Sequence, residues 1–496
     1  MEILKNTVSK VLPPREISCF KAYDLRGILD ETIDEDIAYR VGRSFVDVLN
    51  VNSVVVGYDA RASSQDLAAA VIRGIRDAGA AVIDIKLAGT EEVYSATSHF
   101  GAGGGIEITA SHNPINYNGM KIVAEGSRPV DPDAELAEVH KVAEAGRFKV
   151  QGHLGGYRDA HIEARSAYVK KVLSFIDVDS LRPLKLVVNC GNGAAAAAYT
   201  AIKQELENLA APLEFVDQFL EPDASFPNGI PNPLLVENQP VTREKVLASQ
   251  ADIGVAFDGD FDRCFFFDET GQFIPGEYIV GLLADIFLDK EPAAAIVHDP
   301  RVVLNTRDVI AAKGGQAVQS KTGHAFVKQV MRKHEAVYGG EMSAHHYFRD
   351  FSYCDSGMIP WLLICELMGR TGKPLSTLLA ERMQKFPSSG EHNFKISEPA
   401  KAISAVVDAY KKDALIEDRS DGVSLEFNSW RFNLRSSNTE PVVRLNIESR
   451  NDTQLVNEKF QEISAILNQF ASQPTLGFWE MVGPCISLFK RMQGHP

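Results

Sequence analysis

Residues 105–114 read Gly105-Ile106-Glu107-Ile108-Thr109-Ala110-Ser111-His112-Asn113-Pro114. The apolar start of this stretch predicts a β-strand. The polar run that follows predicts a loop, because Ser, Asn and Pro are common turn residues. A plain turn and a functional loop fit these residues about equally. The preceding glycines favour a functional loop, because they let a ligand approach the backbone closely.

The same order of strand, helix and polar loop recurs along the chain. Leading strands are predicted near residues 54, 185 and 295, and a polar loop follows each of them near 111, 258 and 341. This alternation favours α/β domains, and it indicates three related units whose direct sequence similarity is weak. A helix is predicted over 65–78. The predicted strands are 54–58, 81–85, 105–109, 184–189, 252–257, 295–298 and 336–338.

The pattern changes from about Pro387 onward. Alternating apolar residues predict a hairpin of strands 423–427 and 430–434, followed by a strand over 442–448 and a helix over 453–470. The expected fold is therefore three similar mixed-sheet α/β domains plus a smaller α+β C-terminal domain around a central cleft. The predicted domains are 15–160, 161–265, 266–385 and 386–471. The tail 472–496 is apolar, broken by Gly and Pro, and expected to have no function.

Composition excludes several classes of protein. The 496 residues are 45% hydrophobic and 24% charged, as in ordinary globular proteins, and the net charge of −15 disfavours a nucleic-acid binder. Six scattered cysteines without zinc-ligand spacing fit a reducing compartment. No apolar run is long enough to span a membrane, and the N-terminus has no signal-peptide core. We expect a cytoplasmic protein, either a monomer or a homodimer, without a membrane or nucleic-acid partner.

Three alternating carboxylates form the second polar loop. Asp258, Asp260 and Asp262 follow an apolar strand, and Gly259 lets the loop curl. Such carboxylates suit Mg²⁺, which prefers oxygen ligands, and the adjacent Arg263 is suited to hold a phosphate oxygen. The alternative is a solvated acidic turn. Phe261 interrupts the loop, and its side chain is expected to turn inward.

Two further loops carry groups suited to a sugar phosphate. Glu341 and Ser343 offer an acceptor and a donor two residues apart, which suits neighbouring sugar hydroxyls; the alternative is a polar cluster at a helix start. The last loop lies between predicted strands and combines a guanidinium with hydroxyl and amide groups, as a phosphate cradle would; the alternative is a plain hairpin turn. Its residues are Arg435, Ser437, Asn438 and Thr439.

These four loops, in this order, resemble those of the α-D-phosphohexomutase family, and their local sequences are most similar to its bacterial phosphomannomutases. The resemblance covers roughly residues 15–470. It implies that Ser111 carries the transferred phosphoryl group, that Lys121 helps in proton transfer, and that Mg²⁺ binds Asp258, Asp260, Asp262 and phosphorylated Ser111. The further residues that it places at the active site are Tyr23, Arg26, His112, Asn113, Arg263, His324, Glu341, Ser343, His345, Arg435, Ser437, Asn438 and Thr439.

The expected activity is reversible conversion of mannose 6-phosphate and mannose 1-phosphate through a hexose 1,6-bisphosphate, which also serves as activator. The resemblance places this reaction in GDP-mannose and polysaccharide synthesis. A phosphoglucomutase or dual-specificity mutase remains an alternative, because Glu341 and Ser343 would read hydroxyls away from C2. A glucosamine mutase is less favoured, because Met342 stands where that branch has a polar residue. A non-catalytic phosphosugar-binding protein is the alternative from another class.

Overall fold

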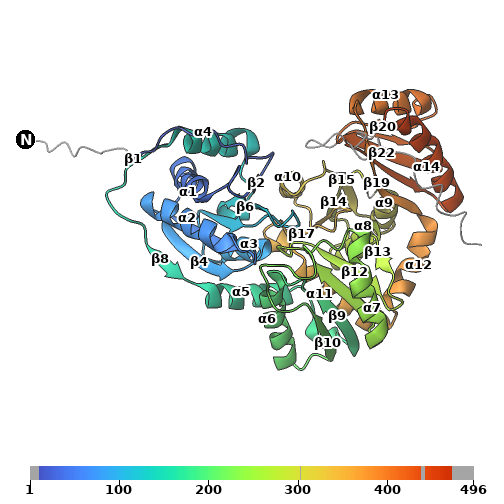
Figure 1. The fold of residues 1–496 in the computed structure, drawn as a ribbon. Helices are drawn as coiled ribbons and strands as arrows, with labels where there is room; N and C mark the ends of the chain where they lie inside the picture. Colours follow the sequence, from blue (N-terminus) through green and yellow to red (C-terminus); the bar gives the residue numbers. More distant parts are fainter. Residues whose placement is uncertain (1–9, 302, 437–441, 472–496) are drawn as a thin grey trace, which may run out of the picture. The chain divides into compact units, whose positions relative to one another are not determined.

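The computed structural model describes residues 10–301, 303–436 and 442–471, which form two compact units (Figure 1). The first unit ends at Phe386 and the second begins at Pro387. Ser437, Asn438 and Thr439, as well as the tail 472–496, lie outside the described residues. Across the described part of the chain, the helices are too short or too polar to cross a membrane.

Three mixed sheets build the first unit. The first has the strand order β2-β6-β5-β3-β4-β8, the second β10-β9-β11-β12-β13 and the third β15-β14-β16-β17-β18. Their strands are β2 (Leu25–Ile28), β3 (Ser53–Tyr58), β4 (Ala81–Leu87), β5 (Gly104–Ile108), β6 (Tyr117–Ala124), β8 (Tyr157–Asp159), β9 (Leu184–Asn189), β10 (Leu213–Gln218), β11 (Ile253–Phe257), β12 (Cys264–Asp268), β13 (Phe273–Ile274), β14 (Ala295–His298), β15 (Gln316–Gln319), β16 (Tyr338–Gly340), β17 (His346–Phe348) and β18 (Cys354–Asp355).

Helices connect and cover these sheets. They are α1 (Glu35–Leu49), α2 (Ser64–Asp77), α3 (Thr90–His99), α4 (Ala137–Ala145), α5 (His161–Leu173), α6 (Ala195–Asn208), α7 (Pro240–Ser249), α8 (Gly276–Lys290), α9 (Leu304–Ala312), α10 (His324–His334), α11 (Met358–Thr371) and α12 (Leu375–Lys385). A short pair, β1 (Lys10–Val11) with β7 (Arg147–Phe148), ties the start of the described chain to the end of α4.

One strand topology occurs three times. In each sheet the leading strand (β3, β9 or β14) pairs in parallel with the strand after it and, on its other side, with the third strand (β5, β11 or β16). The third strand then pairs antiparallel with the next one. The serine, aspartate and glutamate loops each join this third strand to its antiparallel neighbour. The predicted three related α/β units are therefore confirmed as a shared fold.

Alternating burial explains how the sheets hold their helices. Val54 and Val56 pack with α1 and α2 in one core, whereas Val55 packs with α3 and Ala164 of α5 in another. Val187 of β9 likewise faces α7, and its neighbours Leu186 and Val188 face the α6 side. Such leading strands are apolar on both faces because helices cover both.

The described residues of the second unit form a five-stranded antiparallel sheet and two helices. Its strand order is β19-β23-β22-β21-β20, and Trp430, Phe432 and Leu434 of β22 lie in its core. The predicted hairpin and final helix are confirmed. The elements are β19 (Ser388–Lys395), β20 (Ile416–Asp418), β21 (Val423–Glu426), β22 (Trp430–Ser436), β23 (Val442–Ser449), α13 (Pro399–Tyr410) and α14 (Thr453–Asn468).

The domain ranges inferred from the sequence remain a proposal. Strand pairing favours moving the boundary at 265 to a point after Ile274, because β12 and β13 pair in the second sheet. Among the described residues the cysteines are buried and form no disulfide; they are Cys19, Cys190, Cys264, Cys354 and Cys365.

Candidate active site

Ser111 sits in the β5–β6 loop with a left-handed backbone (φ 50°) and is 5% exposed. Arg61, which is also buried, fixes this loop. Its guanidinium donates to the carbonyl oxygens of Ser111 (2.9 Å), Asn113 (2.6 Å), Pro114 (2.8 Å) and Tyr117 (3.1 Å). Five N–H donors in a fixed fork allow one side chain to hold four carbonyls. The unusual backbone of Ser111 is thus imposed by its surroundings.

Three groups surround the Ser111 hydroxyl. It donates to Asp258 Oδ2 at 3.0 Å, and Arg263 Nη2 lies 3.2 Å from its oxygen. His112 Nδ1 also lies 3.2 Å from Oγ. The serine and aspartate loops come this close because Gly259 has no side chain: a Cβ there would lie 2.3 Å from the Ser111 carbonyl oxygen. The serine oxygen therefore lies beside both a carboxylate and a guanidinium.

The three aspartates converge as the sequence pattern predicts. Asp258, Asp260 and Asp262 are buried, and one oxygen from each lies within 4.8 Å of the others. Oδ1 of Asp260 and Oδ1 of Asp262 have no hydrogen-bond partner within the described residues. Buried carboxylate oxygens without partners are costly unless a cation binds them. The donor set is all oxygen, so it fits a hard divalent cation such as Mg²⁺.

Lys121, on β6, crosses to the aspartate loop. Its ammonium donates to Asp260 Oδ2 at 2.6 Å and also to Asp262 Oδ2. Burial alone would lower the pKa of Lys121, but the charges of Asp260 and Asp262 outweigh it and raise the pKa above the usual value. Lys121 is therefore protonated at neutral pH. It partly neutralises the acidic cluster and joins the first sheet to the second.

Two histidines of the site, His112 and His345, are neutral. Arg263 Nη2 lies 2.6 Å from His112 Nδ1, and this positive charge is the main reason that the pKa of His112 falls to about 3. Desolvation of the imidazole lowers the pKa of His112 further. The pKa of His345 is lowered well below its usual value, by burial first and then by Arg263. Both rings are available as proton acceptors at neutral pH.

The glutamate loop adjoins the aspartate loop, since Arg263 and His345 form an isolated antiparallel bridge. Glu341 is 1% exposed; its carboxylate accepts from the Gly323 amide at 2.7 Å and from the Tyr347 hydroxyl. Ser343 Oγ lies 3.0 Å from His345 Nδ1. In this structure Glu341 thus fixes the turn that precedes His324, while Ser343 remains only half buried.

Residues near the start of the chain reach the same region. The Tyr23 ring meets the His324 ring edge-on at 4.6 Å, which brings the first and third sheets together. Arg26 donates to the Thr109 carbonyl at 3.0 Å and pairs with Asp24 at 3.1 Å. Asn113 is half buried beside Ser111. The predicted residues of the first unit therefore belong to one connected region.

Arg435 belongs to the second unit. It lies near the end of β22 and pairs with Glu391 of β19 at 3.1 Å. Its predicted partners Ser437, Asn438 and Thr439 fall outside the described residues. A phosphate-binding role for this loop remains a prediction.

Besides Arg61, sequence reasoning missed two residues that shape this region. Thr90, the first residue of α3, donates its hydroxyl to Asp260 Oδ2 at 2.5 Å. Glu91 is completely buried and accepts from Ser356 and from the amides of Gly357 and Met358, which caps the start of α11. The available signal was their position soon after β4, at the start of α3 and at the same edge of the sheet as the serine loop.

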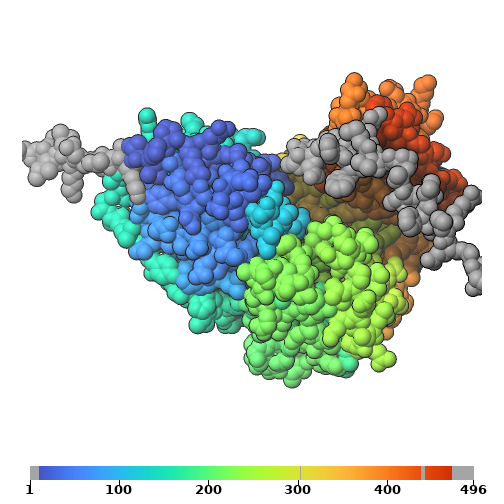
Figure 2. All heavy atoms as spheres, in the orientation of Figure 1, coloured from blue at the N-terminus to red at the C-terminus, as the bar shows by residue number. Residues whose placement is uncertain are grey.

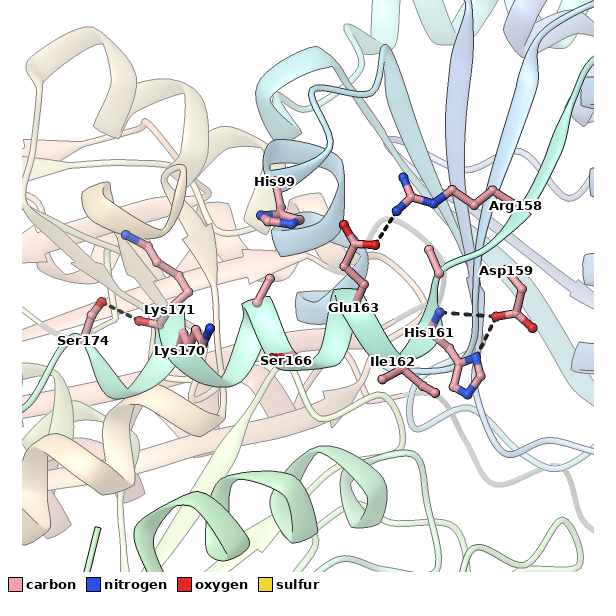
Figure 3. Close-up of a pocket in the computed structure, with 12 residues that line it drawn as sticks. His99, Arg158, Asp159, His161, Ile162, Glu163, Ser166, Lys170, Lys171 and Ser174 are labelled. Atoms are coloured by element: carbon pink, nitrogen blue, oxygen red, sulfur yellow. Dashed lines mark hydrogen bonds and ion pairs between the residues drawn. The ribbon is translucent and has the colours of Figure 1, made fainter. Parts of the chain in front are cut away.

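A large surface groove lies away from this cluster. Its volume is about 1160 Å³. Its lining residues follow α5 (Figure 3). Several of its charged groups are already paired: Arg158 with Glu163, and His161 with Asp159 at 2.6 Å. The buried serine and aspartates form a different site. This site belongs to the first unit, and the blue and green parts of that unit meet in Figure 2.

Comparison with known proteins links these four sheets to one family. Residues 18–149, 166–271 and 275–386 match alpha/beta/alpha domains I, II and III of phosphoglucomutase/phosphomannomutase, and residues 391–466 match its C-terminal domain. A phosphomannomutase of Salmonella montevideo is 55% identical over 91% of this chain and 99% of its own length. One from Escherichia coli K12 is 53% identical over 92% of this chain and its full length. The crystal structure of a phosphoglucomutase/phosphomannomutase family protein from Burkholderia thailandensis has a TM-score of 0.80, with 32% identity over 92% of this chain and 100% of its own.

Proposed function

The chain belongs to the phosphoglucomutase/phosphomannomutase family and is an isomerase, and we propose that it interconverts mannose 6-phosphate and mannose 1-phosphate. The choice of mannose rests on the relatives named phosphomannomutase that are more than 50% identical. The observation that carries the chemistry is the position of Ser111 Oγ, 3.0 Å from Asp258 Oδ2 and 3.2 Å from Arg263 Nη2.

The proposed reaction begins with phosphorylated Ser111. The bond between Oγ and phosphorus breaks as a bond forms from phosphorus to the free hydroxyl oxygen of the sugar phosphate, which gives a hexose 1,6-bisphosphate. The intermediate then turns over, and its other phosphoryl group returns to Oγ. In the first half, one proton passes overall from the sugar hydroxyl to Ser111 Oγ; in the second half it passes back to the sugar.

Charged residues suit this transfer, since phosphoryl transfer depends mainly on positioning and charge stabilisation. Arg263 lies beside Oγ and would bind phosphoryl oxygens. Lys121 is protonated and would supply the proton to the departing oxygen, while the neutral imidazole of His345 would accept one from the attacking hydroxyl. His112, whose Nδ1 faces Arg263, would orient that guanidinium.

Asp258, Asp260 and Asp262, together with phosphorylated Ser111, would hold Mg²⁺. When bound, the ion offsets the negative charge that develops during transfer. Glu341, Ser343 and His324 would bind the sugar, with Tyr23, Arg26 and Asn113 around them. Arg435 and residues 437–439 would hold the phosphate that is not reacting. We further propose cytoplasmic action that feeds GDP-mannose and polysaccharide synthesis.

Phosphorus NMR tests the substrate. Purified protein with Mg²⁺ and a trace of hexose 1,6-bisphosphate is given α-mannose 1-phosphate or α-glucose 1-phosphate in parallel. Faster conversion of the mannose ester to its 6-phosphate supports a phosphomannomutase. Equal rates would support a dual-specificity mutase, which remains the second candidate because Glu341 and Ser343 do not distinguish C2 epimers.

Ser111→Ala tests the phosphoserine. It should abolish turnover while sugar-phosphate binding, measured by calorimetry, persists, because Arg435 and the glutamate loop remain. Turnover at the wild-type rate would refute a phosphoserine at this position. Sugar-phosphate binding without turnover in the wild type would favour a binding protein.

A further inference from the structure

Two hydrogen bonds from one residue, Thr90, join the N-terminus of α3 to the aspartate loop. The Thr90 hydroxyl donates to Asp260 Oδ2 at 2.5 Å, and the Thr90 amide donates to the Asp260 carbonyl at 3.2 Å. Thr90 and Asp260 are both completely buried. The first amides of a helix have no partner within the helix, so the amide bond satisfies Thr90 while the hydroxyl bond acts on the carboxylate itself. The two bonds therefore fix both the backbone and the side chain of Asp260.

The hydroxyl bond determines which carboxylate oxygen remains open. Oδ2 of Asp260 accepts from both Thr90 and Lys121. Oδ1 of Asp260 is buried and has no partner among the residues that the structure describes. A carboxylate held at one oxygen cannot rotate freely, so its other oxygen keeps a fixed direction. Oδ1 is thus the oxygen that Asp260 offers to a cation.

We propose that Thr90 is a positioning residue for the divalent-cation site: its hydroxyl orients the Asp260 carboxylate so that Oδ1 faces the ion. The proposal rests on the proposed metal site and adds to it a residue from helix α3, about 170 residues before the aspartate loop. Groups that hydrogen-bond a ligating carboxylate typically change metal affinity about 10- to 100-fold when they are removed.

The packing of Phe261 supports the same role for α3. Phe261 stands between Asp260 and Asp262, is completely buried and adopts a left-handed backbone (φ 49°). Its ring lies against Gly89, the residue before α3, where a Cβ would lie 2.1 Å from the Phe261 ring carbon Cε1. The loop is therefore seated on the start of α3 by packing as well as by the Thr90 hydrogen bonds. Glu91 in turn ties α3 to the start of α11.

A purely structural role for Thr90 makes a different prediction. If Thr90 only filled space, Thr90→Val would preserve its shape and leave metal binding unchanged, whereas Thr90→Ser, which loses a methyl group, would weaken packing. If the hydroxyl orients Asp260, Thr90→Val weakens metal binding, whereas Thr90→Ser, which keeps the hydroxyl, does not. Thr97 offers a matched control: it is equally buried on the same helix, but its hydroxyl donates to Val93 O at 2.7 Å and does not contact the aspartates.

The experiment measures Mn²⁺ affinity of the full-length protein by electron paramagnetic resonance, with Mg²⁺ competition. The variants are Thr90→Val, Thr90→Ala, Thr90→Ser and Thr97→Val, with Asp262→Asn to identify the site. We expect the dissociation constant to rise about 10- to 100-fold for Thr90→Val and Thr90→Ala, and to stay within about threefold of wild type for Thr90→Ser and Thr97→Val. Thr90→Ala serves if Thr90→Val does not fold. Turnover should recover partly at high Mg²⁺, with the KM for sugar phosphate unchanged.

The outcomes separate this inference from the proposed function. Wild-type affinity in Thr90→Val or Thr90→Ala, with binding lost in Asp262→Asn, would overturn the role of Thr90 and leave the metal site intact. Equal weakening in Thr90→Val and Thr97→Val would also overturn it, because the effect would then belong to the helix. Wild-type protein that binds no Mn²⁺, or Asp262→Asn that binds it normally, would overturn the metal site itself and with it this inference.

Discussion

Replacing Arg61 by lysine should loosen the loop that carries Ser111. Arg61 donates to four loop carbonyls from two nitrogens. Lysine keeps the positive charge beside Asp59 but has a single nitrogen without the planar fork, so it reaches about two of these carbonyls. A hydrogen bond to a charged group contributes about 1.5–3 kcal/mol. Losing about two should lower the free energy of local opening by at least about 3 kcal/mol, or at least about 100-fold in the opening equilibrium.

Hydrogen exchange measures this opening directly. The amides of Ser111, Asn113 and Tyr117 are hydrogen-bonded within the folded loop, so their exchange reports whether it opens. Mass spectrometry of a peptide covering 109–117 should show at least about 100-fold faster exchange in Arg61→Lys, and kcat should fall because the Ser111 backbone is no longer fixed. Hydrogen exchange is the better measure here because it reports local opening, whereas a multidomain chain does not unfold in a single two-state transition.

Arg40→Lys is the matched control. Arg40 is 2% exposed and also holds backbone carbonyls, those of Ala143 and Pro13, in the same α/β domain. Its replacement should speed exchange near residues 143–146 and leave 109–117 unchanged. If Arg61→Lys exchanges over 109–117 within threefold of wild type, the loop is held by something other than the guanidinium and the reasoning fails.

Two further predictions concern stability. Phe261→Gly removes a completely buried ring, which costs about 3–5 kcal/mol, but it relieves a left-handed backbone that costs about 1–2 kcal/mol. We therefore expect a net loss of stability of about 2–3 kcal/mol and a lower Tm by calorimetry. An unchanged Tm would mean that the relief of backbone strain offsets the lost packing. Asp34→Asn keeps a side-chain cap on α1 but loses the ion pair with Arg15. Partial burial raises the pKa of Asp34, but hydrogen bonds from Arg15 and from the Ile37 amide outweigh it, so the pKa is lowered overall. The charge of Asp34 therefore stabilises the fold above the ordinary aspartate pKa, and this stabilisation is lost as pH falls through the lowered folded pKa. At pH 7 the Tm of Asp34→Asn should be slightly below that of the wild type, by an amount worth below about 1 kcal/mol, and the difference should vanish in acid. A difference that persists in acid would refute the ion pair as its cause.

Local pattern was enough to predict the leading and third strands of each α/β sheet and the polar loops, but not the antiparallel neighbours β6, β12 and β17. The strands predicted at 184–189 and 295–298 are confirmed with the same bounds, because turn residues limit each apolar run. The strand predicted at 336–338 is instead Tyr338–Gly340, because pairing with β14 begins opposite Ile296. Phe261 turns inward as expected, although nothing in its own sequence shows that Gly89 provides the space.

The contacts that hold the site together could not be predicted, because they join distant segments. Thr90 and Asp260 are 170 residues apart, and Arg61 lies about 50 residues before the loop it holds. A single sequence gives each of these residues a local environment but not a partner. Their roles depend on which sheet edges meet, and strand topology decides that.

The repeated topology explains why loops so far apart in the sequence meet with such different chemistry. In each sheet the polar loop follows the third strand, at the end where the parallel strands finish, and leads into an antiparallel neighbour. This position lies where the core ends, so the polar residues can differ from one loop to the next, although Phe261 of the aspartate loop still packs into the core. One loop therefore carries Ser111, the next the three aspartates, and the last Glu341. Direct contacts join them: Ser111 to Asp258, and Arg263 to His345. The sheets determine where the loops lie, whereas a few long-range side chains, including Arg61, Lys121 and Thr90, determine how their functional groups are oriented.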